Sequence, residues 1–130
     1  MNPRFKRMTA LAVMALCVKN FAQAQNPPTD REIARELEVP IRLVRSVLAN
    51  LKEARLLSEV SGDHPDDISY QPACDIQRLT VAEVNNRLDT QGLGAVPIAE
   101  SRDVEKLRET LKRFQEITDQ SSANLQLRDL

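Results

Sequence analysis

The chain has 130 residues, of which 42% are hydrophobic and 28% charged, and this composition excludes an intrinsically disordered chain and a membrane protein with many spans. Because it contains no Trp, one Tyr and three Phe, we expect one small globular unit with an aliphatic core. Two cysteines and one histidine are too few for a zinc site, a Cys-x-x-Cys pair or a disulfide framework. Most catalytic chemistry is therefore excluded.

The net charge of −1 hides an uneven distribution of charge along the chain. Residues 1–25 carry four basic residues and no acidic one, whereas residues 57–130 carry eight basic and fourteen acidic residues. A basic N-terminal segment with an acidic C-terminal part can orient a protein against a polyanion, either a nucleic acid or an anionic membrane surface.

The N-terminal segment fits two interpretations. Arg4, Lys6 and Arg7 precede an apolar run over 8–18, and the small residues of 22–24 follow, which is the layout of a secretory signal. The same segment also has the helical spacing of a core helix, and its run is shorter than the roughly 20 residues that span a bilayer. We favour the core helix, since the next elements need a first helix to pack on, and keep secretion as the minority interpretation. Its predicted inner side comprises Leu11, Met14, Ala15, Val18, Phe21 and Ala22, and its polar side Thr9, Lys19, Asn20 and Gln23.

The next part of the chain predicts two short helices joined by a tight turn. Thr29 and Glu32 form a capping box, so a helix should occupy 30–37. Pro40 belongs at the first position of the next helix, which should extend to about residue 55. The spacing is that of a helix-turn-helix. The predicted buried residues are Ile33, Ala34 and Leu37 in the first helix and Ile41, Val44, Val47, Leu48 and Leu51 in the second.

A hairpin and a further helix should follow. The β-capable runs 56–61 and 68–72 flank a turn-rich loop, which predicts two antiparallel strands. Thr80 and Glu83 form a second capping box, and the helix that they begin should end near Thr90, before Gly92 and Gly94. Its inward residues should be Val81, Val84 and Leu88. The predicted fold is mainly α with a small β-hairpin, namely a winged helix-turn-helix plus a C-terminal helix.

The C-terminal part should form one amphipathic helix. Ser101 can cap it, and apolar residues recur three and four apart along it, at Val104, Leu107, Leu111 and Phe114. Two heptads are too few for an independent coiled coil, so we expect this helix to pack on its own domain, with a homodimer seam as the alternative. We accordingly divide the chain into a winged-helix domain, 1–94, and a linker, C-terminal helix and tail, 95–130.

In the predicted helix-turn-helix, one face of the second helix is a candidate nucleic-acid-binding surface. Arg pairs with guanine, Asn pairs with adenine, and the small Ala49 would let the helix approach the groove floor. The wing argues against this function, because its acidic residues would face phosphates. A protein-interaction module is therefore favoured, and duplex DNA binding is the alternative. The candidate residues are Arg42, Arg45, Ser46, Asn50 and Lys52, and the opposing acidic ones are Glu59, Asp63, Asp66 and Asp67.

The remaining reactive residues predict no catalytic or cofactor site. His64 stands on a turn without converging ligands, Cys17 is expected to be a buried hydrophobe, and Cys74 to be partly exposed. Tyr70 should pack on the core. No nucleophile, base and orienting group can be proposed together, so we expect a non-enzymatic protein without a cofactor.

The order of several short motifs resembles the cytosolic C-terminal winged-helix region of long members of the YihY/BrkB, or ribonuclease BN-like, membrane protein family. The resemblance rests on V-x-x-F-A at 18–22, P-I-R-L-V at 40–44, Y-Q-P-A at 70–73, D-I at 75–76, L-T-V at 79–81 and, more loosely, L-x-L-R-D-L at 125–130. It implies a regulatory or assembly domain on the cytoplasmic side of an inner-membrane protein, with Arg4, Lys6 and Arg7 beneath the bilayer, where each cation contributes about 1 kcal/mol.

The chain is also similar to the Rrf-type winged-helix repressors. These place a hydrophobic helix before an I-A-x-x-L helix-turn-helix, as at 33–37, and an L-T-V helix after the wing. Members of that family that bind an iron–sulfur cluster carry three cysteines near the wing, whereas this chain has only Cys74 there. The resemblance therefore implies a regulator without a cluster.

Two hypotheses follow. The first is a non-enzymatic interaction domain at the inner face of the cell membrane, bound to a protein partner or to a YihY/BrkB-like parent. The second is a cytoplasmic, dimeric, Rrf-like regulator that binds duplex DNA and pairs through its C-terminal helix.

Overall fold

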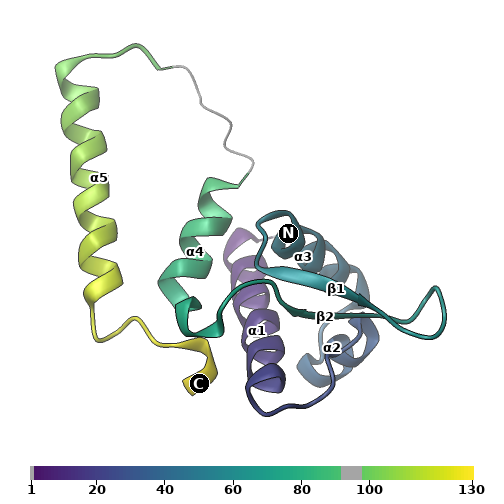
Figure 1. Cartoon of the computed structure of the whole chain (residues 1–130). Helices are drawn as coiled ribbons and strands as arrows, with labels where there is room; N and C mark the ends of the chain where they lie inside the picture. The colour runs from purple at the N-terminus through teal and green to yellow at the C-terminus, as the bar shows by residue number, and fades with distance from the viewer. Residues whose placement is uncertain (1, 92–97) are drawn as a thin grey trace.

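The computed structural model describes residues 2–91 and 98–130 and is mainly helical with one two-stranded sheet (Figure 1). The elements in chain order are α1 (Pro3–Ala22), α2 (Asp30–Leu37), α3 (Ile41–Glu53), β1 (Leu57–Ser61), β2 (Ile68–Pro72), the 3-10 turn η1 (Ile76–Arg78), α4 (Val81–Thr90), α5 (Arg102–Gln120) and the 3-10 turn η2 (Leu127–Asp129). The predicted fold class is confirmed.

Helix α1 is a central core helix, as predicted. It begins earlier than the apolar run, because the Asn2 side chain accepts a hydrogen bond from the Arg4 amide and Pro3 occupies the first turn. The prediction of its inner side was partly wrong, since Phe21 is exposed and Thr9 is buried. Burial of Thr9 is tolerated because its hydroxyl donates to the Phe5 carbonyl at 2.9 Å. The buried residues of α1 are Thr9, Ala10, Val13, Met14, Cys17 and Val18.

The helix-turn-helix forms as predicted. Both halves of the Thr29–Glu32 capping box are present, and Glu38 takes the left-handed conformation that ends α2. Pro40 precedes α3 as its N-cap rather than standing inside its first turn, which corrects the predicted start. Leu43, which the sequence did not place in the core, is buried, whereas Ile41 is only half-buried.

The wing is a tight antiparallel hairpin. Strands β1 and β2 pair with Leu57 opposite Pro72 and Ser61 opposite Ile68, so β1 starts one residue later than predicted. The six-residue loop closes through a hydrogen bond from the Gly62 amide to the Asp67 carbonyl at 2.7 Å. On its other edge β2 meets the chain before α2, where Thr29 and Ser69 form an isolated bridge.

Helix α4 follows the predicted bounds and carries Val84 into the core. The Thr80 hydroxyl accepts from the Glu83 amide at 3.1 Å. The Glu83 carboxylate binds Arg87 at 2.9 Å, so only one half of the second predicted capping box is observed. Residues Gly92 and Gly94, and the predicted domain boundary at 94–95, lie outside the described residues.

Helix α5 contacts α4 only near its C-terminal end, so the prediction that it packs on its own domain was largely wrong. Its Ser101 cap is present, accepting from the Val104 amide at 3.1 Å, but none of its residues is buried. Figure 1 shows α5 standing apart from the body, beyond α4. Its large apolar side chains are 60–64% exposed, namely Leu107, Leu111, Phe114 and Ile117.

After α5 the chain returns to the core. Leu127 in η2 is fully buried against α1, and its amide donates to the Leu79 carbonyl at 3.0 Å. Lys19 of α1 holds the last residue by a hydrogen bond to the Leu130 carbonyl oxygen. The end of the chain is thus part of the packing that supports α1.

Candidate nucleic-acid interface

Helix α3 presents a polar face to solvent because its opposite face fills the core. Val44, Val47, Leu48 and Leu51 are at most 2% exposed. The five predicted site residues all lie on the remaining face, where four are exposed and Asn50 is half-buried. Helical spacing divides this face into two rows, because residues four apart stack on one side of a helix. The α1-side row is Arg42, Ser46 and Asn50, and the wing-side row is Arg45, Ala49 and Lys52.

The cations of the wing-side row are paired with carboxylates. The Arg45 Nε lies 2.9 Å from the Asp30 Oδ2 at the start of α2. The Lys52 Nζ lies 2.7 Å from the Glu59 Oε1 on β1, and this hydrogen bond and charge raise the pKa of Lys52. Both basic residues therefore hold the helix-turn-helix and the wing together across the surface.

The α1-side row lies beside the N-terminal part of α1. Lys6, Arg42 and Ser46 line a shallow hollow of about 210 Å³. Lys6 also lines a neighbouring hollow of about 200 Å³ together with Arg7 and Asn50. Polar residues from α1 and α3, far apart in sequence, thus border one strip, whose floor also includes the apolar Leu43, Val47 and Leu88.

Of the three cations near this strip, Arg7 is paired with a carboxylate of the described residues, whereas Lys6 and Arg42 are not. The Arg7 guanidinium is held by α4, at 3.1 Å from the Asn85 Oδ1 and 2.8 Å from the Asp89 Oδ1. Among the residues that the structure describes, neither Lys6 nor Arg42 lies within ion-pair distance of a carboxylate.

The surface of the wing is acidic, as the sequence predicted. Asp63, Asp66 and Asp67 are all exposed at its tip. At its base, the pKa of Tyr70 is raised by burial and by the negative charges of Glu59 and Asp30. The Tyr70 side chain packs against the core, which confirms its predicted structural role.

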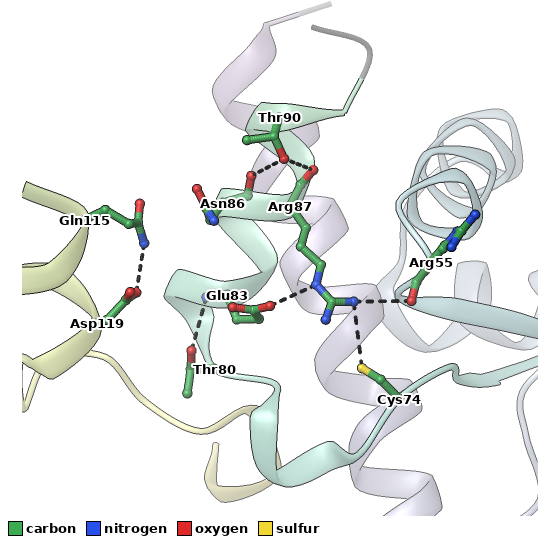
Figure 2. A network of polar contacts seen from close by, with 9 residues as sticks. All are labelled: Arg55, Cys74, Thr80, Glu83, Asn86, Arg87, Thr90, Gln115 and Asp119. Carbon is green, nitrogen blue, oxygen red and sulfur yellow. Dashed lines mark hydrogen bonds and ion pairs between the residues drawn. The ribbon is translucent and has the colours of Figure 1, made fainter. Parts of the chain in front are cut away.

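A polar network that the sequence did not reveal fixes the turn between α3 and the wing (Figure 2). Arg87 of α4 donates from Nε to Glu83 at 2.9 Å and from Nη1 to the Arg55 carbonyl at 3.4 Å, while Cys74 Sγ lies 3.9 Å from the same Nη1. Arg55 has a φ of 60°, in the left-handed region, so this turn is one that few side chains adopt freely. The only sequence signal was the Glu83–Arg87 spacing of four residues.

The remaining reactive residues lie as predicted. Cys17 is buried, and desolvation raises the pKa of its thiol to about 12. Cys74 is half-buried and His64 is exposed on the wing loop. Within residues 2–91 and 98–130, no group of three or more His, Cys, Asp or Glu side chains is placed to hold a metal ion. No helix in those same ranges combines the length and the apolar character needed to cross a membrane.

The arrangement of α2, α3 and the hairpin is that of a winged helix-turn-helix. Neither a protein-family model nor a curated protein sequence matches the chain. Solved structures do. The chain is similar to IscR of T. potens, with 17% identity and a TM-score of 0.60 over 90% of this chain and 79% of IscR.

Two further solved structures match this chain over almost their whole length. CymR (YrzC), the global cysteine regulator of B. subtilis, has 17% identity and a TM-score of 0.63 over 99% of this chain and 93% of CymR. CymR of Staphylococcus aureus has 17% identity and a TM-score of 0.60 over 95% and 93%. At these identities the likeness concerns the fold, and it includes the C-terminal helix because the coverage extends over it.

Proposed function

We propose that this protein is a dimeric winged-helix regulator that binds duplex DNA through α3 and carries no iron–sulfur cluster. The observation that carries the proposal is the helix-turn-helix whose second helix exposes a polar face, which includes Arg42 and Ser46, while its other face is fully buried. These residue types are the ones that bind phosphates and base edges in a major groove. The fold similarity to IscR and CymR supports this function over the protein-interaction module that the acidic wing favoured.

The exposed stripe of α5 supports the dimer. Its four large apolar side chains are 60–64% exposed, and covering them stabilises an assembly by roughly 1–2 kcal/mol per side chain. The helix carries five basic and five acidic residues, so two copies of it do not repel each other through net charge. A second copy of the chain is therefore the occupant that we propose for this face. Two copies would also present two α3 helices to one duplex.

The comparisons give no support to an association with a YihY/BrkB-like membrane protein. The motifs that carried that resemblance have mainly structural roles, since Pro40 precedes α3 and Leu79 and Leu127 lie in the core. We therefore favour the regulator.

The test is fluorescence anisotropy of a labelled mixed-sequence duplex, titrated with the purified protein between about 50 and 200 mM salt, where phosphate contacts lose affinity steeply. We expect micromolar binding with a steep salt slope, and we expect the variant Arg42→Ala to weaken it. Absence of binding by the unaltered protein at the lowest salt would refute the function.

The dimer is tested separately by sedimentation. We expect the unaltered protein to sediment at about twice its monomer mass and the variant Leu111→Glu to sediment as a monomer, because a buried charge opposes pairing. Lys112→Glu, on the neighbouring position of the same helix, is the matched control and should remain dimeric. A monomeric unaltered protein at micromolar concentration would refute this part of the proposal.

A further inference from the structure

Resting on the proposed function, we propose that the cations which neutralise DNA phosphates are Lys6 of α1 and Arg42 of α3, and that the wing and the wing-side row of α3 make no phosphate contacts. Two charges that the sequence assigned to binding, those of Arg45 and Lys52, then have a structural role instead. The docking surface is the strip between α1 and α3, and its partner is the backbone of duplex DNA.

The first argument concerns the ion pairs on α3. A basic side chain strengthens DNA binding mainly because it releases counterions that surround the phosphates. Arg45 and Lys52 already neutralise Asp30 and Glu59, at 2.9 and 2.7 Å, so turning toward a phosphate would leave a bare carboxylate beside the DNA. For these two residues the gain from a phosphate contact is therefore offset by the pair that it breaks.

The second argument concerns the wing. Its exposed loop carries Asp63, Asp66 and Asp67, and Asp66 lines the same hollow as Asp30 and Arg45. Carboxylates at this edge repel phosphates over about a Debye length, which is about 10 Å at 0.1 M salt. DNA that approaches α3 is therefore displaced from the wing toward α1.

The third argument is the chemistry of the strip on the α1 side. Lys6 borders both hollows, with Arg42 and Ser46 on one side and Asn50 on the other. An ammonium, a guanidinium, a hydroxyl and an amide supply donors for consecutive phosphate oxygens. Lys6 and Arg42 also lie outside every ion pair of the described residues, so their charge is available.

The number of these phosphate contacts can be measured from the salt dependence of DNA affinity. Each neutralised phosphate contributes about 0.9 to the slope of log affinity against log salt. Two contacts therefore contribute about 1.8, which corresponds to about a twelvefold difference in affinity between 50 and 200 mM salt.

The experiment compares two double variants that remove the same net charge. The test variant is Lys6→Gln with Arg42→Gln, and the matched control is Arg45→Gln with Lys52→Gln. Both are titrated against the same duplex across the salt series, after circular dichroism has shown that each is folded. We expect the test variant to lower the slope by about 1.8. The control should leave the slope within about 0.5 of the unaltered protein, although its affinity falls because the Asp30 and Glu59 carboxylates lose their partners.

The outcomes separate this inference from the proposed function. If the unaltered protein binds and the control loses as much slope as the test variant, or the test variant loses none, the inference is wrong while the function stands. If the unaltered protein binds no duplex but cosediments with phosphatidylserine vesicles, both are wrong and the strip is a membrane-facing surface.

Discussion

The burial of Leu127 makes the C-terminal tail a part of the fold. The variant Leu127→Ala measures how much this side chain contributes to the free energy of unfolding. The side chain is fully buried against α1, beside Leu79. Truncation to Ala removes three carbon atoms, at about 0.8 kcal/mol for each buried carbon, or about 2.4 kcal/mol of transfer free energy. The cavity that remains raises the expected loss into the range of roughly 2.7–5 kcal/mol measured for buried leucines.

The assay is urea unfolding followed by circular dichroism, with all variants at one protein concentration because a dimer makes apparent stability concentration-dependent. Leu125→Ala is the matched control, since Leu125 lies two residues away and is 50% exposed. It should lose about half as much transfer free energy, about 1.2 kcal/mol. A loss at Leu127 no larger than that at Leu125 would refute the reasoning, because it would mean that the tail detaches without disturbing the core.

Three further changes test other parts of the structure. Thr29→Ala removes the hydroxyl that caps α2 and should lower the free energy of unfolding by about 1 kcal/mol in the same urea assay; no change would mean that the cap is dispensable. Gly62→Ala should lower it by about 1–3 kcal/mol, because the new Cβ would lie 2.7 Å from the Asp67 Cβ, and an unchanged stability would contradict the tight hairpin. The pKa of Cys17 is raised to about 12 from an ordinary value of 9.0, so the unfolded chain loses this proton first as the pH rises. The contribution of this thiol to the free energy of unfolding is thus complete well below pH 9 and falls by roughly 1 kcal/mol by pH 10; Cys17→Val should flatten this dependence on pH, and equal slopes would refute it. A thiol reagent should accordingly label Cys74 quickly and Cys17 only on unfolding.

Local chemistry made most of the elements predictable from sequence. The Thr29–Glu32 capping box located α2 because both of its partners lie within four residues. No start was predicted for α1, although its signals, Asn2 followed by Pro3, are equally local. Where the signal is confined to one turn, the sequence is sufficient to place the element.

The position of α5 could not be predicted in the same way. A stripe such as Leu107, Leu111 and Phe114 indicates that a helix face needs a partner, but it does not say whether that partner is the same chain or another copy. The linker that would decide how far α5 can fold back has no periodic pattern to constrain it. The burial of Leu127 was hidden for a related reason, since a short tail with a 3-10 turn gives no helical period.

The candidate site was also predictable only in the part that depends on local sequence. Helical spacing placed Arg42, Arg45 and Lys52 together on one face of α3. It could not show that Asp30 and Glu59, from α2 and β1, would neutralise two of them, because those pairs depend on how three elements pack. The spacing therefore predicted which residues share one face of α3, and it left open which of their charges are paired with carboxylates.

The signal-like composition of the N-terminal segment follows from where α1 lies. A helix that is apolar on most of its circumference is one that is covered on most sides. Helix α1 packs against α2, α3, β2, α4 and η2, and Val13, Met14, Cys17 and Val18 are at most 1% exposed. The apolar run that resembles a signal is thus what a central helix of a small domain requires. The basic residues before this run are explained separately: the N-terminal end of α1 emerges from the core, and Lys6 there lines a surface hollow together with Arg42.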